Sequence, residues 1–262
     1  MKRGPSGEMP FLDHLEELRY RLLWSIGALV VCMMVAFTLV LRYDVIGLLS
    51  APIQPFLTNG KLVFTHPADP FSITLKVAFG IGLVAAMPII GYHLWAFLAP
   101  ALHQHEKRVV IPLLFGATGL FATGVYLSVI WVLPASFDVL FGIQSAALEQ
   151  MITAKDYFSF AVSLSLACGA AFQLPIVVMA LTMLGVVTPT LLAKYRRHAA
   201  VGSLLAAAII TPGDLLIMTV MLGVPLYGLY EISIVLSWLV HRSKLKKERA
   251  RAAAERIGGN PE

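Results

Sequence analysis

Long apolar stretches alternate with short polar segments along the whole chain. A helix that crosses a bilayer needs roughly 20 mostly apolar residues, and the apolar stretches are too long for β-barrel strands of about 10 alternating residues. The sequence therefore predicts an all-α polytopic membrane protein with six transmembrane helices. We expect these spans at about 22–41, 74–98, 109–134, 157–185, 199–211 and 215–240.

The last two predicted spans are short. Thr211, Pro212, Gly213 and Asp214 form a turn signal that divides the final apolar stretch into a hairpin. The first arm, residues 199–211, would reach only about 20 Å at 1.5 Å per residue, so the bilayer should thin beside it. Together with a kink in the fourth span, this predicts a concave, cup-like face.

The positive charges are distributed unevenly between the two sides of the predicted membrane. Sixteen of the twenty lysines and arginines fall on the side of the chain ends, and only Arg42, Lys61, Lys76 and Lys155 fall on the other. Cytoplasmic loops carry such an excess, so both termini are expected in the cytoplasm. We expect a single integral membrane domain, residues 1–241, followed by a basic, disordered cytoplasmic tail, residues 242–262.

Composition supports the membrane interpretation. Hydrophobic residues make up 58% of the chain and charged residues 13%, whereas a soluble domain has about a quarter charged residues. Cys32 and Cys168 both lie in apolar stretches and suit packing rather than metal binding or redox chemistry. The sequence contains no phosphate-binding glycine loop and no recognisable catalytic motif, so we expect neither enzymatic activity nor a cofactor.

The segment before the first span is amphipathic at helical spacing. Phe11 and Leu22 bound a stripe of apolar residues, while Asp13, Glu16 and Glu17 point away from it. An interfacial helix is one interpretation. However, surface anchors usually carry basic residues to meet anionic lipid, and three carboxylates suit a cationic partner better.

A second candidate site lies in the loop after the second predicted span. Glu106 is its only acidic residue, and it follows His103 and His105. Three potential ligands in a short loop are common by chance, so no metal site is predicted. The simpler alternative is a solvated loop in which Glu106 pairs with Lys107 or Arg108.

Two polar residues fall inside predicted spans, where polar groups often have functions. Gln173 lies two residues before Pro175, which frees the backbone carbonyl of Ala171 and kinks the helix. Gln173 either forms a functional polar patch or bonds that carbonyl or a neighbouring helix. Glu231, in the inner half of the last span, either pairs with a loop cation or stays partly hydrated.

Four segments resemble one protein family in order and spacing. Residues 9–21 contain a His-Leu-x-Glu-Leu-Arg-x-Arg pattern, residues 95–108 resemble the family's first cytoplasmic loop, residues 50–52 its first periplasmic segment, and residues 209–214 its second hairpin tip. The family is TatC, the core subunit of the twin-arginine protein translocase.

The resemblance implies a function in protein export. Family members bind the signal peptides of folded proteins and recruit single-span TatA- and TatB-type partners for export driven by the proton-motive force. By this resemblance the signal-peptide-binding residues are Glu17, Glu106 and Phe97, with Arg19 and Arg21 beside them. It also implies a bacterial cytoplasmic (inner) membrane location, a homo-oligomeric receptor complex and contact with membrane lipid, but no nucleic acid.

The resemblance also assigns residues away from the signal-peptide site. Gln173 stands where some relatives carry Glu, so no carboxylate titrates there and contact with a partner helix is favoured, together with Glu231. Pro52 and Asp214 are expected to have structural roles on the periplasmic side. The alternative is a secondary transporter or small-molecule permease, which should show an internal repeat, broken helices or acidic residues at mid-membrane. A membrane enzyme is less favoured still.

Overall fold

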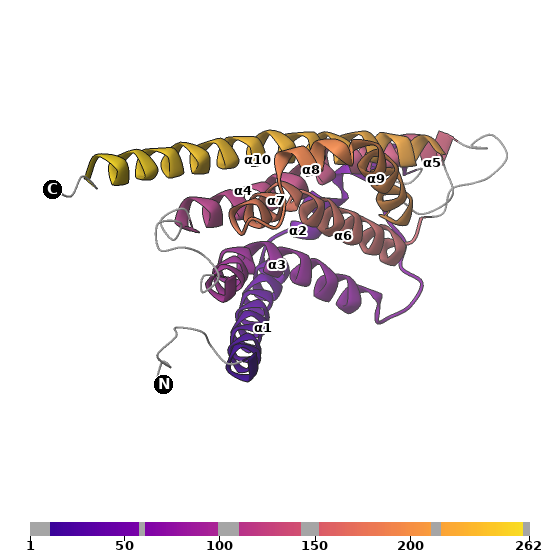
Figure 1. Ribbon diagram of the computed structural model, residues 1–262. Helices are drawn as coiled ribbons and strands as arrows, with labels where there is room; N and C mark the ends of the chain where they lie inside the picture. The colour runs from indigo at the N-terminus through magenta and orange to yellow at the C-terminus, as the bar shows by residue number, and fades with distance from the viewer. Residues whose placement is uncertain (1–10, 58–60, 99–109, 143–151, 211–215, 259–262) are drawn as a thin grey trace. The chain divides into compact units, whose positions relative to one another are not determined.

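The computed structural model describes residues 11–57, 61–98, 110–142, 152–210 and 216–258 (Figure 1). The chain divides into two compact units, Met1–Ala170 and Ala171–Glu262. Each unit is described by itself below.

The described part of unit 1 is built mainly from helices. They are α1 (Phe11–Arg42), α2 (Val45–Ser50), the 3₁₀-helix η1 (Ala51–Phe56), α3 (Asp69–Leu98), α4 (Val110–Leu127), the π-helical turn η4 (Ser128–Val132), α5 (Leu133–Gly142) and α6 (Ala154–Ala171). An isolated parallel bridge joins Val63 to Thr153.

Helices α1 and α3 pack closely because a glycine faces the contact. A Cβ atom on Gly82 of α3 would lie 2.7 Å from the Cα atom of Met33 on α1. Small residues let transmembrane helices approach until their backbones nearly touch. This contact fixes the beginning of α1 near the end of α3, and both segments carry predicted site residues.

The third span contains a wider turn immediately before a proline. Helix α4 continues through the π-helical turn Ser128–Val132 into α5, whose second residue is Pro134. Because proline lacks an N–H group, it removes one regular helical hydrogen bond. The π-helical turn is a known way for a helix to absorb such an irregularity.

The fourth span is interrupted where the sequence predicts a kink. Helix α6 ends at Ala171, residues 172–173 form a turn, and α7 (Leu174–Met183) begins with Pro175 in its first turn. Proline is well tolerated at the start of a helix, where its missing N–H would have no partner. The predicted kink is therefore confirmed as a break in the helix.

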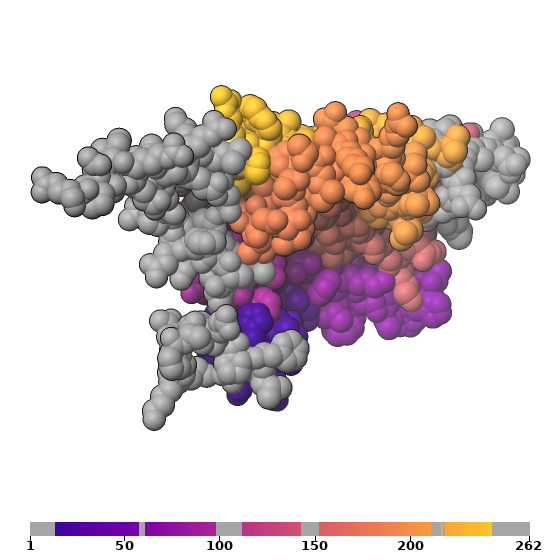
Figure 2. All heavy atoms as spheres, in the orientation of Figure 1, coloured from indigo at the N-terminus to yellow at the C-terminus, as the bar shows by residue number. Residues whose placement is uncertain are grey.

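Unit 2 contains α7, α8 (Pro189–Lys194), α9 (Arg196–Ile210) and α10 (Leu216–Gly258). Helices α7, α8 and α9 all contact α10, and the space-filling view shows the orange side chains of α8 and α9 beside the yellow part of α10 (Figure 2). The buried hydroxyls of Thr182 and Ser237 lie 2.8 Å apart and link α7 to α10. After α7 the chain turns at Gly185, whose φ of 76° favours glycine.

The all-α polytopic prediction is confirmed. Among the described residues, five helical segments are long and apolar enough to cross a membrane: His14–Arg42, Asp69–Phe97, Pro112–Gly142, Ala154–Met183 and Met218–Arg242. The predicted short fifth span corresponds to α9, which has 15 residues. The last span-length segment has 25 residues, fewer than the 29–31 of the other four.

The end of the chain differs from the prediction. Residues 242–258 were expected to be disordered, but they continue α10 as helix to Gly258. This stretch is rich in alanine, lysine, arginine and glutamate, which are among the strongest helix formers. The prediction of disorder relied on the low hydropathy of this segment. A polar segment can nevertheless be helical when it extends an existing helix, because no new helix nucleus has to form.

Candidate functional site

The candidate site in unit 1 is centred on the carboxylate of Glu17, near the beginning of α1. The side chain of Glu17 is 19% exposed. Its Oε1 accepts hydrogen bonds from Arg21, at 3.0 Å from Nε and also from Nη2. Arg21 lies one helical turn further along, the spacing at which side chains on a helix meet. Arg21 therefore holds and neutralises one half of the carboxylate.

The other half of the Glu17 carboxylate is left without a hydrogen bond. Oε2 is buried and has no hydrogen-bond partner among the described residues. His14 Nδ1 lies 3.6 Å from Oε2, which is beyond hydrogen-bond range. A buried acceptor without a donor costs free energy. Glu17 can therefore accept a further N–H donor.

His14 connects Glu17 to the end of α3. The imidazole stacks on the ring of Phe97, with a centroid separation of 4.3 Å and an interplanar angle of 11°. The close packing of α1 on α3 makes this contact possible. The structure thus brings Glu17, His14 and Phe97 together. We call these three residues and Arg21 the Glu17 cluster.

The other predicted signal-peptide residues have different positions. Arg19 is exposed, and no carboxylate lies within 4 Å of it in the described part of the chain. Arg21 is half-buried and belongs to the Glu17 cluster. Glu106 lies outside the described residues, as do His103 and His105.

Sequence analysis did not assign a role to His14. The available signal was its position three residues before Glu17, which places both side chains on one face of a helix. The stacking on Phe97 could not be read in this way, because it depends on the packing of α1 against α3.

A second polar cluster lies in unit 2 around Glu231. Its Oε2 accepts a hydrogen bond from Arg196 Nη2 at 2.9 Å, and its Oε1 accepts one from the Tyr227 hydroxyl at 2.7 Å. Arg196 is the first residue of α9 and follows the short helix α8. Glu231 therefore pairs with Arg196, a cation of the predicted loop, and its side chain also stays partly exposed at 33%.

Gln173 lies at the break between α6 and α7. It is half-buried and occupies the N-cap position of α7. Its backbone carbonyl accepts the N–H of Val177 at 2.9 Å and begins the helix. The amide is therefore placed at an interruption of the transmembrane helix, where backbone groups lack their regular partners.

The segment that contains Pro52 is anchored within unit 1. Pro52 lies in η1, where Ile53 is fully buried. The hydroxyl of Tyr157 on α6 donates a hydrogen bond to the carbonyl of Leu49 just before it. Pro52 therefore lies in a rigid turn that connects α2 to the rest of the unit. Asp214, the other predicted residue of this kind, lies outside the described residues.

Asp69 is a buried carboxylate that the sequence analysis did not single out. It begins α3 and accepts hydrogen bonds from the backbone N–H groups of Thr65 at 3.1 Å and His66 at 2.9 Å. Lys155 Nζ lies 3.9 Å away. These contacts fix the connection that leads into α3, so we assign Asp69 a structural role.

Comparisons with known proteins agree on one family. Residues 13–225 match the family described as Sec-independent protein translocase protein (TatC). The TatC protein of Aquifex aeolicus is 37% identical over 244 residues, which cover 92% of this chain and 100% of the relative. The TatC protein of Escherichia coli K12 is 34% identical over 229 residues, 87% of this chain and 88% of the relative.

A solved structure supports the same assignment. A crystal structure described as Twin Arginine Translocase Receptor TatC superimposes with a TM-score of 0.75 and 37% identity, over 87% of this chain and 99% of that one. The family consists of translocase components and not of enzymes. The match extends from the Glu17 cluster in unit 1 to α10 in unit 2, and the chain belongs to the TatC family of Sec-independent protein translocase proteins.

Proposed function

We propose that this chain is the receptor and core scaffold of a twin-arginine translocation system. It binds the twin-arginine signal peptides of folded proteins and recruits single-span TatA- and TatB-type partners for export driven by the proton-motive force. It does so in a bacterial cytoplasmic membrane, with both termini in the cytoplasm. Membership of the TatC family and the uneven distribution of lysine and arginine support this proposal.

The observation that carries the proposal is the unpaired oxygen of Glu17. Arginine presents a planar fork of N–H donors that matches a carboxylate, and the guanidinium is less strongly hydrated than an ammonium. An arginine of the signal peptide would donate to Oε2, which has no donor among the described residues. At 4 Å and an effective dielectric of 20, such a pair is worth up to about 4 kcal/mol before desolvation.

The aromatic side of the Glu17 cluster suits the same ligand. Phe97 and His14 are stacked with their rings nearly parallel. A guanidinium can lie over an aromatic face, with a gain of about 0.5–1 kcal/mol at exposed sites. The cluster therefore combines a carboxylate with a planar surface, both of which favour arginine over lysine.

The second arginine of the signal needs a second acidic partner. We assign this role to Glu106, the only acidic residue in the loop between the second and third spans. Phe97 is close to the end of α3, from which that loop begins. Two carboxylates on one side of the membrane would give two adjacent arginines one partner each.

We assign partner recruitment to the polar residues of unit 2. Polar side chains inside the membrane form hydrogen bonds between transmembrane helices. Gln173 at the break before α7 and the cluster around Glu231 are such groups. The Gln173 amide does not ionise, which favours hydrogen bonding to a partner helix over proton transfer.

Crosslinking of signal peptides in membrane vesicles tests the receptor function. A peptide with a photoreactive residue beside the two arginines is compared with a Lys-Lys peptide on wild type, Glu17→Gln and Glu106→Gln. We expect the Arg-Arg peptide to crosslink, and either substitution to reduce the yield by about tenfold, which corresponds to roughly 1.4 kcal/mol.

Glu16→Gln is the matched control, because Glu16 neighbours Glu17 but is exposed on another face of α1. It should leave the crosslinking unchanged. Equal crosslinking of the Arg-Arg and Lys-Lys peptides, combined with silent Glu17 and Glu106 substitutions, would reject the receptor function and favour the permease alternative.

A further inference from the structure

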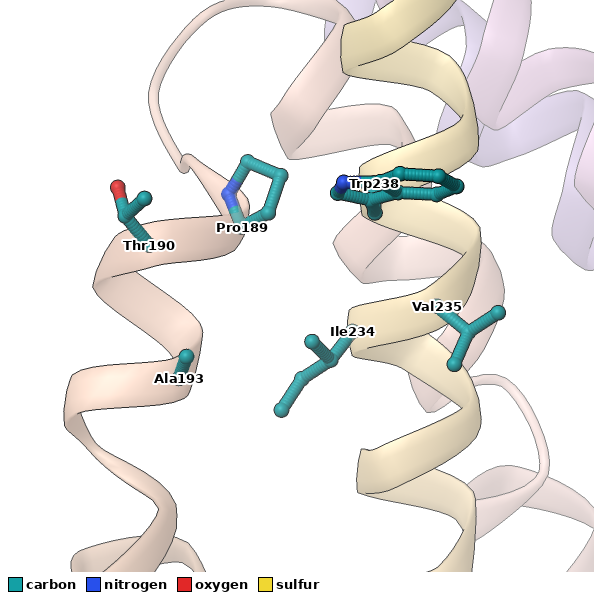
Figure 3. Close-up of a pocket in the computed structure, with 6 residues that line it drawn as sticks. All are labelled: Pro189, Thr190, Ala193, Ile234, Val235 and Trp238. Carbon is teal, nitrogen blue, oxygen red and sulfur yellow. The ribbon is translucent and has the colours of Figure 1, made fainter.

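Unit 2 contains an open groove between α8 and α10 that the proposed function does not use. It has a volume of about 330 Å³ and is lined by Pro189, Thr190 and Ala193 from α8 and by Ile234, Val235 and Trp238 from α10. Figure 3 shows Ile234 pointing from α10 toward α8, with Trp238 near Pro189 at one end of the groove. Five of the six lining side chains are apolar.

The groove exposes large apolar side chains at one end of a membrane span. Trp238 is 49% exposed and Val235 is 57% exposed. Trp238 lies four residues before Arg242, where the span-length segment of α10 ends. Tryptophan is enriched at this depth, where its ring meets the lipid headgroups. The groove therefore lies at the boundary between acyl chains and headgroups, on the side with more basic residues.

One basic side chain lies beside the groove, and a second follows a lining residue in the sequence. The guanidinium carbon of Arg242 lies over the ring of Trp238, 5.1 Å from its centroid. Lys194 directly follows the lining residue Ala193 and is exposed. Within the described part of the chain, neither has a carboxylate within 4 Å, whereas the nearby Arg196 is already paired with Glu231. The positive charge beside the groove is therefore available to an anionic ligand.

We propose that this groove binds an anionic phospholipid of the cytoplasmic leaflet. The apolar lining takes part of an acyl chain, and Arg242, beside Trp238, binds the phosphate. Arginine is suited to phosphate because its fork of donors binds two oxygens at once. Basic pockets beside transmembrane helices on the cytoplasmic side are typical sites for anionic headgroups.

The dimensions of the groove favour a lipid over a protein helix. Helix α8 has six residues and therefore extends only about 9 Å. A transmembrane partner helix packs over a longer stretch, with small residues on both sides. One wall of the groove is instead formed by the bulky residues Ile234 and Trp238.

Fluorescence quenching by brominated lipids tests the proposal. The full chain with Trp24, Trp95 and Trp131 replaced by phenylalanine retains Trp238 as its only tryptophan. It is reconstituted in bilayers that contain either brominated phosphatidylglycerol or brominated phosphatidylcholine. We expect phosphatidylglycerol to be preferred at Trp238 by about fivefold for each basic side chain that contributes.

Two substitutions separate charge from shape. Arg242→Gln should reduce the preference about fivefold, and Ala193→Phe should abolish it by filling the groove while both charges remain. A protein that retains only Trp131, an exposed tryptophan of unit 1, is the control and should show no preference.

Equal quenching of Trp238 by the two lipids, or a preference that survives both substitutions, would overturn the proposal. Protection of Trp238 from both lipids would also overturn it, because that result would show that protein covers the groove. If the triple phenylalanine variant does not fold, native mass spectrometry of the wild type, Arg242→Gln and Ala193→Phe with added phosphatidylglycerol measures the same difference in bound lipid.

Discussion

The contact between His14 and Phe97 should contribute to signal-peptide binding. His14→Ala removes the ring that stacks on Phe97 and whose Nδ1 atom lies 3.6 Å from the Glu17 Oε2 atom. Stacked aromatic pairs contribute about 0.5–1.5 kcal/mol beyond the area that they bury. If the stack holds α1 and α3 in the geometry that binds arginine, its loss weakens peptide binding by about two- to tenfold.

A double-mutant cycle measures this contribution directly. The affinity of a fluorescent Arg-Arg peptide is determined by anisotropy for wild type, His14→Ala, Phe97→Ala and the double variant in nanodiscs. Each single substitution already breaks the stack. We therefore expect the loss of affinity in the double variant to be smaller than the two single losses multiplied together. The coupling free energy should be about 0.5–1.5 kcal/mol.

The control for this cycle is Tyr20→Ala combined with Phe97→Ala. Tyr20 is an exposed aromatic residue of α1 that pairs with Trp24 and not with Phe97, so its effect should be additive. Additivity of His14→Ala and Phe97→Ala within about 0.3 kcal/mol would refute the reasoning, because it would show that the stack does not set the geometry of the site.

Three further predictions concern the packing and polar contacts of the two units. In a denaturation assay, Gly82→Ala should destabilise the protein by about 1–3 kcal/mol, because the added methyl group meets the backbone of Met33. Gly119→Ala is the control and should be neutral or stabilising, because nothing lies within 4 Å of the added methyl group. Ser237→Ala should cost about 0.5–1.5 kcal/mol in that assay because it removes the hydrogen bond between α7 and α10, while the Thr182 hydroxyl keeps its bond to the Val178 carbonyl; no loss would show that the pair does not contribute to stability. Glu231→Gln should change stability by less than about 1 kcal/mol because its ion pair is partly exposed, and a larger loss would contradict that assignment.

The sequence was sufficient for the long helical spans because hydropathy and span length are local properties. Hydropathy located the long spans, and Pro175 located the break between α6 and α7. The short fifth span, predicted to end at residue 211, was also predicted from the sequence, since α9 ends at Ile210. What hydropathy could not show was the continuation of α10 to Gly258, because there helix propensity rather than burial determines the structure.

The candidate site could be predicted only where its contacts lie within one helix. The pair of Glu17 and Arg21 follows from a spacing of four residues. The stack of His14 on Phe97 and the ion pair of Arg196 with Glu231 join residues far apart in the sequence. These contacts depend on which helices pack together and at what distance, and a single sequence does not contain that information.

The arrangement around Glu17 explains how one carboxylate can be held in place by its own helix and still accept a hydrogen bond from a ligand. Arg21 satisfies Oε1 within the same helix, so the carboxylate is held in place in the absence of a signal peptide. Because Oε2 has no donor among the described residues, binding an arginine there removes an existing cost and does not require the Arg21 contact to be broken. A lysine would have to lose more water from its ammonium group, which is more strongly hydrated than a guanidinium. Its compact charge also could not stack on the planar Phe97–His14 pair as well as a guanidinium does. On this reasoning, preference for arginine arises from the second oxygen of Glu17, and substitutions of Arg21 should affect the position of the carboxylate more than the choice between arginine and lysine.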